Sequence, residues 1–88
     1  MAILTQKLIA TWQNHDDQYN SELSAARKIE INSLVAQGKT DGIFVTVSPT
    51  ITTRDFLDVP SAQEFADWCI NECMTLSIPG PSYEITPL

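Results

Sequence analysis

Two cysteines, Cys69 and Cys73, are four residues apart, a spacing that places both thiols on one face of a helix. Two thiolates can contribute to a zinc site. A closed site needs four ligands, however, and the only histidine, His15, is far away in the sequence. A disulfide at this spacing would strain a helix, and free cysteines are commonly buried in the cores of cytosolic proteins. We therefore expect two buried thiols, no bound metal and no cofactor.

His15 belongs to the run Asn14-His15-Asp16-Asp17, where a neighbouring carboxylate could raise the basicity of the imidazole. A general base also needs a reacting group within reach. The sequence contains no nucleophile motif, no phosphate-binding loop and no metal-binding helix motif, and its three glycines are dispersed. We favour an exposed loop or capping role for His15, and a chain without a catalytic centre.

Arg54 and Asp55 are adjacent in a stretch typical of a strand, so their side chains should point to opposite faces. Arg54 could bind an anion between a sheet and its helices, although such arginines more often form a salt bridge or line an interface. Aromatic side chains could complete a hydrophobic pocket, although a core position or an interface is the commoner role. The candidate pocket residues are Trp12, His15, Arg54 and Tyr83.

Secondary structure must position these side chains, and the clearest element is a helix over residues 60–76. Ser61 and Glu64 have capping-box spacing, with Pro60 just before the cap. Trp68 flanks the apolar face, where it could cover a sheet edge or meet another chain. Apolar residues recur at steps of three and four and predict a stripe that covers a sheet: Ala62, Phe65, Ala66, Cys69, Cys73 and Leu76.

The N-terminal half predicts a strand and a second helix. Residues 3–12 alternate as a strand does, with Leu4, Leu8, Ala10 and Trp12 on one face. Residues 17–37 are rich in helix formers, and Gly38 follows as a glycine C-cap. Its buried side should carry Tyr19, Leu23, Ala26 and Leu34. A strand over residues 29–36 is the alternative.

The remaining elements are three strands. Residues 43–48 and 51–57 are dense in β-branched and aromatic residues, and Pro49 between them predicts a hairpin. Residues 82–86 form a short last strand. The resulting order predicts a single α+β domain over residues 1–88 of the ferredoxin-like βαββαβ type. It would have a four-stranded antiparallel sheet with two helices on one face.

The other face of this sheet would carry apolar residues and should therefore not stay in contact with water. We accordingly expect a homodimer that packs through the sheets or their edges. The candidate interface residues are Ile9, Phe44 and Trp68.

The net charge of −6, from 11 acidic and 5 basic residues, argues against nucleic-acid or anionic-membrane partners, because both need clustered lysine and arginine. Hydrophobic residues make up 43% of the chain, which is typical of a folded domain. No apolar run is long enough to span a bilayer, and the N-terminus lacks the pattern of a signal peptide. We expect a cytosolic protein.

The run Thr53-Arg54-Asp55-Phe56, followed by Ala62-Gln63-Glu64-Phe65-Ala66-Asp67-Trp68, resembles the C-terminal half of small proteins from tailed phages and marine viral sequences. In those proteins a strand with an arginine and an aromatic residue precedes an alanine-rich, aromatic helix. Because they have no assigned activity, the resemblance implies a viral origin and no mechanism.

Two hypotheses of function remain. The first is a non-catalytic homodimeric interaction or accessory protein. The second is a small-molecule binder or cofactor-independent enzyme of the dimeric α+β barrel type, although fold analogy alone is weak support. A cavity into which His15 or Arg54 points would favour the second, whereas a filled interior with both side chains in solvent would exclude it.

Overall fold

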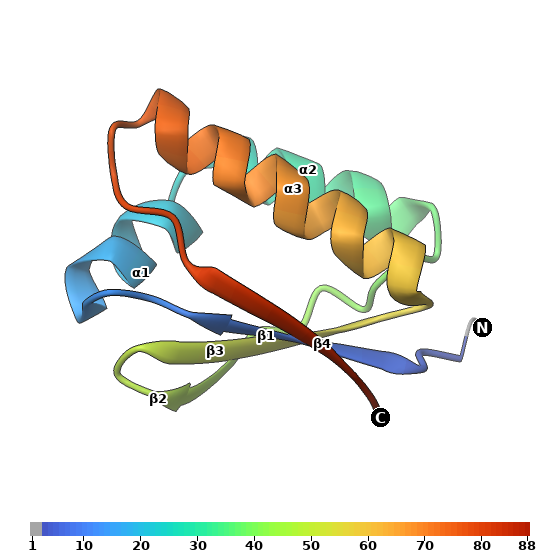
Figure 1. The fold of residues 1–88 in the computed structure, drawn as a ribbon. Helices are drawn as coiled ribbons and strands as arrows, with labels where there is room; N and C mark the ends of the chain where they lie inside the picture. The colour runs from blue at the N-terminus through green and yellow to red at the C-terminus, as the bar shows by residue number, and fades with distance from the viewer. Residues whose placement is uncertain (1–2) are drawn as a thin grey trace.

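The computed structural model describes residues 3–88 and has an α+β architecture with a four-stranded antiparallel sheet and three helices (Figure 1). The strand order is β2-β3-β1-β4, which leaves β2 and β4 at the edges. Within residues 3–88, no helix is long and apolar enough to cross a membrane. In chain order the elements are β1 Gln6–Thr11, α1 His15–Glu22, α2 Ala25–Ala36, β2 Val45–Ser48, β3 Ile51–Phe56, α3 Val59–Thr75 and β4 Ser82–Pro87.

The two faces of the sheet follow from the pairing of the central strand β1. Leu8 lies opposite Arg54 of β3 and Ile85 of β4, and residues opposite each other point to the same face. Leu8 and Ala10 of β1 and Trp12 just after it are buried, which confirms the alternation expected for this segment. Helices α2 and α3 both lie over that face (Figure 1). Arg54 therefore points into the layer between the sheet and the helices.

The single helix predicted over residues 17–37 is wrong, and so is the alternative strand over residues 29–36. Helix α1 ends at Glu22 and α2 begins at Ala25. Between them, the Ser24 hydroxyl accepts a hydrogen bond from the Arg27 N–H at 3.1 Å and caps α2. Serine is a poor residue inside a helix and a strong one at an N-cap, so the chain breaks here. Two helices were predicted for the chain, and the structure has three, because the first of them is divided into α1 and α2.

Of the residues predicted on the buried side of this region, Leu34 is buried as predicted and the other three are not. Tyr19 and Leu23 are 47% and 65% exposed, and Ala26 is exposed as well. The side chains buried in their place are polar or charged: Asp17, Gln18, Ser21 and Arg27. The predicted glycine C-cap is confirmed. Gly38 has a φ of +75°, and its N–H donates to the Val35 carbonyl at 3.0 Å.

Helix α3 matches the predicted amphipathic helix but starts earlier than its proposed cap. Asp58 Oδ1 accepts a hydrogen bond from the Ser61 N–H at 2.9 Å, so Asp58 caps the helix and Ser61 does not. Pro60 consequently lies in the first turn, where its missing N–H has no helical partner to lose. The predicted stripe is buried from Ala62 to Cys73, but Leu76, at the C-cap, is 45% exposed.

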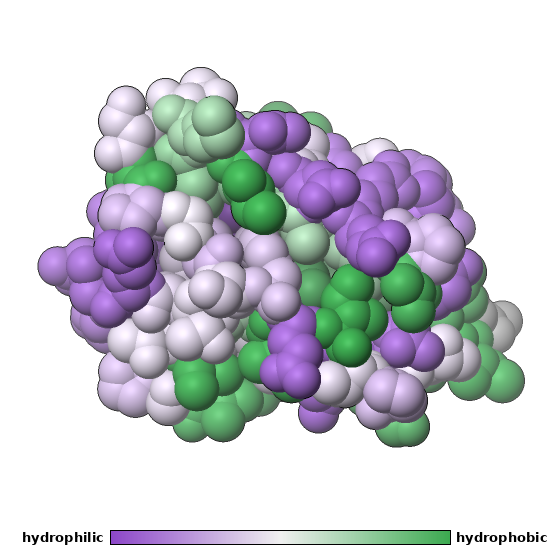
Figure 2. All heavy atoms as spheres, in the orientation of Figure 1, coloured by the Kyte–Doolittle hydropathy of each residue, from purple (hydrophilic) through white to green (hydrophobic). Residues whose placement is uncertain are grey.

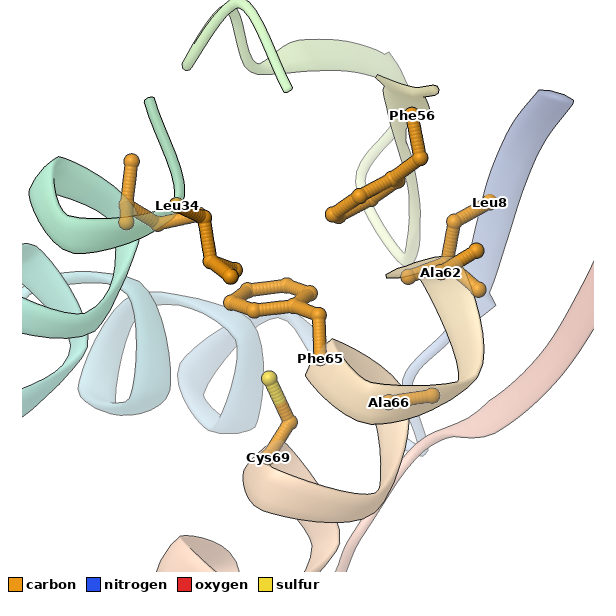
Figure 3. Close-up of a cluster of buried hydrophobic side chains, with 8 residues drawn as sticks. Leu8, Leu34, Phe56, Ala62, Phe65, Ala66 and Cys69 are labelled. Carbon is orange, nitrogen blue, oxygen red and sulfur yellow. The ribbon is translucent and has the colours of Figure 1, made fainter. Parts of the chain in front are cut away.

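The core between α3, α2 and the sheet is centred on Phe65. Its ring lies between Leu34 of α2 and Phe56 of β3, with the two phenylalanine centroids 5.4 Å apart (Figure 3). Cys69 and Cys73 are fully buried free thiols, as the sequence predicted. This apolar core ends where α1 and the start of α2 meet the sheet, and charged side chains take its place there.

Candidate functional site

Four charged side chains meet in this polar layer: Glu22, Arg27, Arg54 and Glu72. Glu22 Oε1 lies 3.0 Å from Arg27 Nη1, and Glu22 Oε2 lies 2.5 Å from Arg54 Nη2. Arg27 Nε lies 3.7 Å from Glu72 Oε2, which is too long for a hydrogen bond but within ion-pair range. Only 1% of Arg27 is exposed. The cluster is therefore a buried ionic network of two cations and two anions.

The break between α1 and α2 is what brings these groups together. The last residue of α1 is Glu22, and the cap Ser24 turns the chain so that Arg27 points inward. The Ser24 hydroxyl also donates to Glu72 Oε1, and Arg27 Nη2 donates to the Ser21 hydroxyl. The network thereby links the α1–α2 junction to α3, and through Arg54 to β3.

Aromatic rings cover the faces of both guanidinium groups. Arg27 Cζ lies 5.4 Å from the centroid of Phe65 and 5.6 Å from that of Trp68. Arg54 Cζ lies 5.2 Å from the centroid of Phe44. These distances are those of cation–π contacts, which gain strength when water is excluded. The arginines are thus held by carboxylates at their edges and by rings at their faces.

A cavity of about 400 Å³ opens beside this network, between the α1–α2 region on one side and strand β3 and the segment just before β2 on the other. Apolar and aromatic side chains form part of its wall. Arg54 Nη1 donates to the Gly42 carbonyl at 3.2 Å, and Gly42 has a φ of +76°, a conformation that favours glycine. The lining residues are Tyr19, Glu22, Leu23, Arg27, Lys28, Ile31, Asn32, Gly42, Phe44 and Arg54.

Positive charge gathers at this cavity although the chain as a whole is acidic. Three of the five basic residues line it, namely Arg27, Lys28 and Arg54, and one acidic residue, Glu22, accompanies them. Glu72 lies behind Arg27 and offsets part of this charge. The wall retains a positive balance, contributed chiefly by Lys28, whose side chain is exposed at the rim.

A second, much smaller cavity lies deeper, on the sheet side of the network. Its volume of about 10 Å³ is near the minimum for one water molecule. Trp12, Arg54 and Tyr83 line it together. Burial raises the pKa of Tyr83 and raises the pKa of the Cys69 thiol to about 12, so both groups stay neutral at neutral pH.

The structure thus brings together three of the four candidate pocket residues and leaves His15 out. His15 is exposed at the start of α1, with its ring edge-on to Tyr19 at 4.5 Å and its Nδ1 3.5 Å from an Asp16 oxygen. Arg54 lines both cavities, whereas Trp12 and Tyr83 line only the deeper one.

The three candidate interface residues occupy different places. Ile9 lies on the sheet face opposite the helices, since it alternates with the buried Leu8. Phe44 lines the larger cavity under Arg54, and half-buried Trp68 stacks on Phe65 at a centroid distance of 6.3 Å.

Sequence reasoning missed Glu22, Arg27 and Glu72. A signal for Arg27 was present, because it precedes the buried Ile31 by four residues and Leu34 by seven, and so lies on the buried stripe of α2. The two glutamates carry no comparable signal, since their partners come from other elements.

Among residues 3–88, no group of three or more histidine, cysteine, aspartate or glutamate side chains is arranged to hold a metal ion. Comparison of the chain with protein-family models, with curated proteins and with solved structures found no match.

Proposed function

We propose that the protein binds a small organic anion in the 400 Å³ cavity, with the apolar body of the ligand inside and its charge at the basic wall. One observation carries this proposal. In a chain of net charge −6, three of five basic side chains, from α2 and β3, converge on a single cavity. A random distribution on an acidic surface gives no reason for that convergence, whereas an anionic ligand does.

The size and chemistry of the wall support the same proposal. Small-molecule sites commonly have volumes of about 300–1,000 Å³ and combine apolar walls with a few placed polar groups. Leu23, Ile31 and Phe44 supply the apolar part here, and the Asn32 amide adds a neutral polar group. The cavity therefore suits a compact aromatic or aliphatic body that carries a carboxylate, sulfonate or phosphate.

The cations have different roles in this proposal. Glu22 already binds one nitrogen of each arginine, which fixes both guanidinium groups and lowers their net attraction for an added anion. Lys28 is exposed at the rim and is the freest to meet the ligand charge. The two arginines thus contribute guanidinium groups in fixed orientations, and Lys28 contributes an ammonium group that can move to contact the ligand.

Two dyes of matched shape test the proposal. 8-Anilinonaphthalene-1-sulfonate carries a sulfonate, and N-phenyl-1-naphthylamine has the same ring body without charge. We expect fluorescence titration to show tighter binding of the sulfonate. Its affinity should fall about two- to fivefold in Lys28→Met, because an exposed ion pair contributes about 0.5–1 kcal/mol. The neutral dye should bind Lys28→Met and the native protein equally.

Lys7→Met is the matched control, since Lys7 lies opposite Asp55 on the sheet face away from the helices. It removes the same charge from the chain and should leave the sulfonate affinity unchanged. Equal affinity of the native protein for the two dyes, or an equal loss in both lysine variants, would contradict a site for anions at this cavity.

We also propose that the fold is of the ferredoxin-like type. Supporting this, the sheet order read from the opposite edge is β4-β1-β3-β2, and each pair of neighbouring strands is antiparallel. The additional helix in the first connection is a departure from the basic arrangement. A cytosolic setting remains part of the proposal and is supported by the two free, buried cysteines.

A further inference from the structure

The two edges of the sheet differ in how they are protected from pairing with another strand. Strand β4 is preceded by Pro81, contains Glu84 and ends at Pro87. Prolines and charges are the usual means by which proteins block an exposed edge. Strand β2, Val45–Ser48, contains neither a charged residue nor a proline, although it has only 4 residues, its register shifts between Thr46 and Ser48, and Pro49 follows it. A short strand and a register shift also limit edge pairing, so the β2 edge differs from the β4 edge in lacking charge and proline within the strand.

Charge adds a second argument, because two copies of a chain with net charge −6 repel each other. Residues 42–53 carry no charged side chain and form the longest uncharged run in the sequence. This run includes all of β2 and the turn that follows it. Two copies can thus approach along β2 with less repulsion than at a surface that carries carboxylates.

The side chains along this edge are apolar and exposed. Ile43 is 60% exposed, Val45 is 48% exposed and Val47 is 63% exposed. Val45 lies opposite Thr53, which in turn lies opposite Ile9, so these three residues form a row on the sheet face away from the helices. Figure 2 shows hydrophobic atoms along the lower left border, over the β2–β3 hairpin. Pairing at this edge would bring the exposed β2 side chains of two copies next to each other and remove part of their apolar surface from water.

We infer that β2 pairs antiparallel with β2 of a second copy, so that the two sheets become one. An antiparallel pair of identical strands is self-complementary, as a two-fold interface requires. With the two-fold axis perpendicular to the sheet, the helices of both copies lie on the same side. Gly42 and Phe44, just before β2, line the larger cavity, so the two cavities lie on the same side of the joined sheet, one towards each end of the shared strand pair.

Light scattering coupled to size exclusion tests this pairing. The native protein at micromolar concentrations should show twice the 9.8 kDa mass of the chain. Val47→Lys places a charge on the shared edge and should raise the dimer dissociation constant at least tenfold. Met74→Lys is the control: Met74 is 72% exposed on α3, away from β2, and its replacement should leave the mass unchanged.

Hydrogen exchange locates the contact. The amides of Val45–Ser48 should become more protected as the protein concentration rises, and those of β4 should not. If Val47→Lys does not fold, as judged by circular dichroism, Val45→Thr with Val47→Thr keeps strand propensity and should still weaken the dimer. A single-chain mass for the native protein, or a dimer without protection of β2, would overturn the inference.

Discussion

Replacement of Arg27 by methionine should be among the most destabilising single changes in this protein. The substitution keeps much of the aliphatic stem and removes a guanidinium that is 1% exposed. Glu22 would keep Arg54 at 2.5 Å, but Glu72 would lose its ion pair and retain the hydrogen bond from Ser24. Only 9% of the Glu72 side chain is exposed, so its carboxylate would be left poorly compensated.

Loss of one partner of a buried ion pair costs about 3–5 kcal/mol. Total stability at about 0.05–0.15 kcal/mol per residue is about 4–13 kcal/mol for a chain of this length. Arg27→Met should therefore remove a large share of the stability. In the double variant Arg27→Met with Glu72→Gln, no unpaired carboxylate remains at position 72. The double variant should therefore be more stable than the sum of the two single losses predicts, by a coupling free energy of about 0.5–3 kcal/mol.

Urea unfolding followed by tryptophan fluorescence measures these losses, because Trp12 is buried and reports the disruption of the core. The control is Lys28→Met, which removes a positive charge from the next residue, an exposed one, and should change the free energy of unfolding by less than about 0.5 kcal/mol. A loss below about 1 kcal/mol in Arg27→Met, with no coupling to Glu72, would show that the network does not hold the helices together.

Two further predictions concern pH. Burial raises the pKa of Cys69 to about 12, so above the ordinary thiol pKa of about 8.5 the unfolded chain ionises first and stability declines towards pH 12. Cys69→Ala should flatten that decline in alkaline urea titrations, and an unchanged slope would contradict it. The hydrogen bonds from Ser61 to Asp58 lower the Asp58 pKa, so its contribution is present above about pH 3.9 and is lost as pH falls through the folded value. Asp58→Asn should weaken the acid dependence of stability, whereas identical acid titrations of the two proteins would exclude this role.

Hydrophobic periodicity was enough to predict β1 and α3, and the density of β-branched and aromatic residues was enough to predict β2 and β3. Leu8, Ala10 and Trp12 alternate and are buried, and the stripe from Ala62 to Cys73 covers the sheet. In these segments the burial of apolar area contributes most of the stabilisation, and the spacing of the apolar residues is visible in the sequence. The extent of β2 was overestimated by two residues, because Ile43 and Phe44 lie outside the paired strand.

Periodicity failed where polar contacts decide the structure. Tyr19 and Leu23 look like the buried side of a helix, yet they are exposed and Gln18 and Ser21 are buried in their place. Ser24 ends one helix and starts the next because its hydroxyl satisfies both a backbone N–H and Glu72. The second of these partners is 48 residues away in the chain, so no local pattern could have shown it.

The same contacts explain why a costly ionic cluster suits the proposed site. Well-packed apolar residues can replace a buried ion pair without loss of stability, so stability alone gives no reason to keep two arginines here. Binding of an anion does give a reason to keep both arginines at this place. Glu22 and the aromatic rings hold Arg27 and Arg54 in fixed orientations before any ligand arrives, and a preorganised wall loses little side-chain entropy on binding. On this proposal the residues that fasten α1, α2 and α3 to the sheet are also those that shape the cavity. Substitutions at the network should then lower ligand affinity and stability together, whereas substitution of Lys28 at the rim should lower affinity alone.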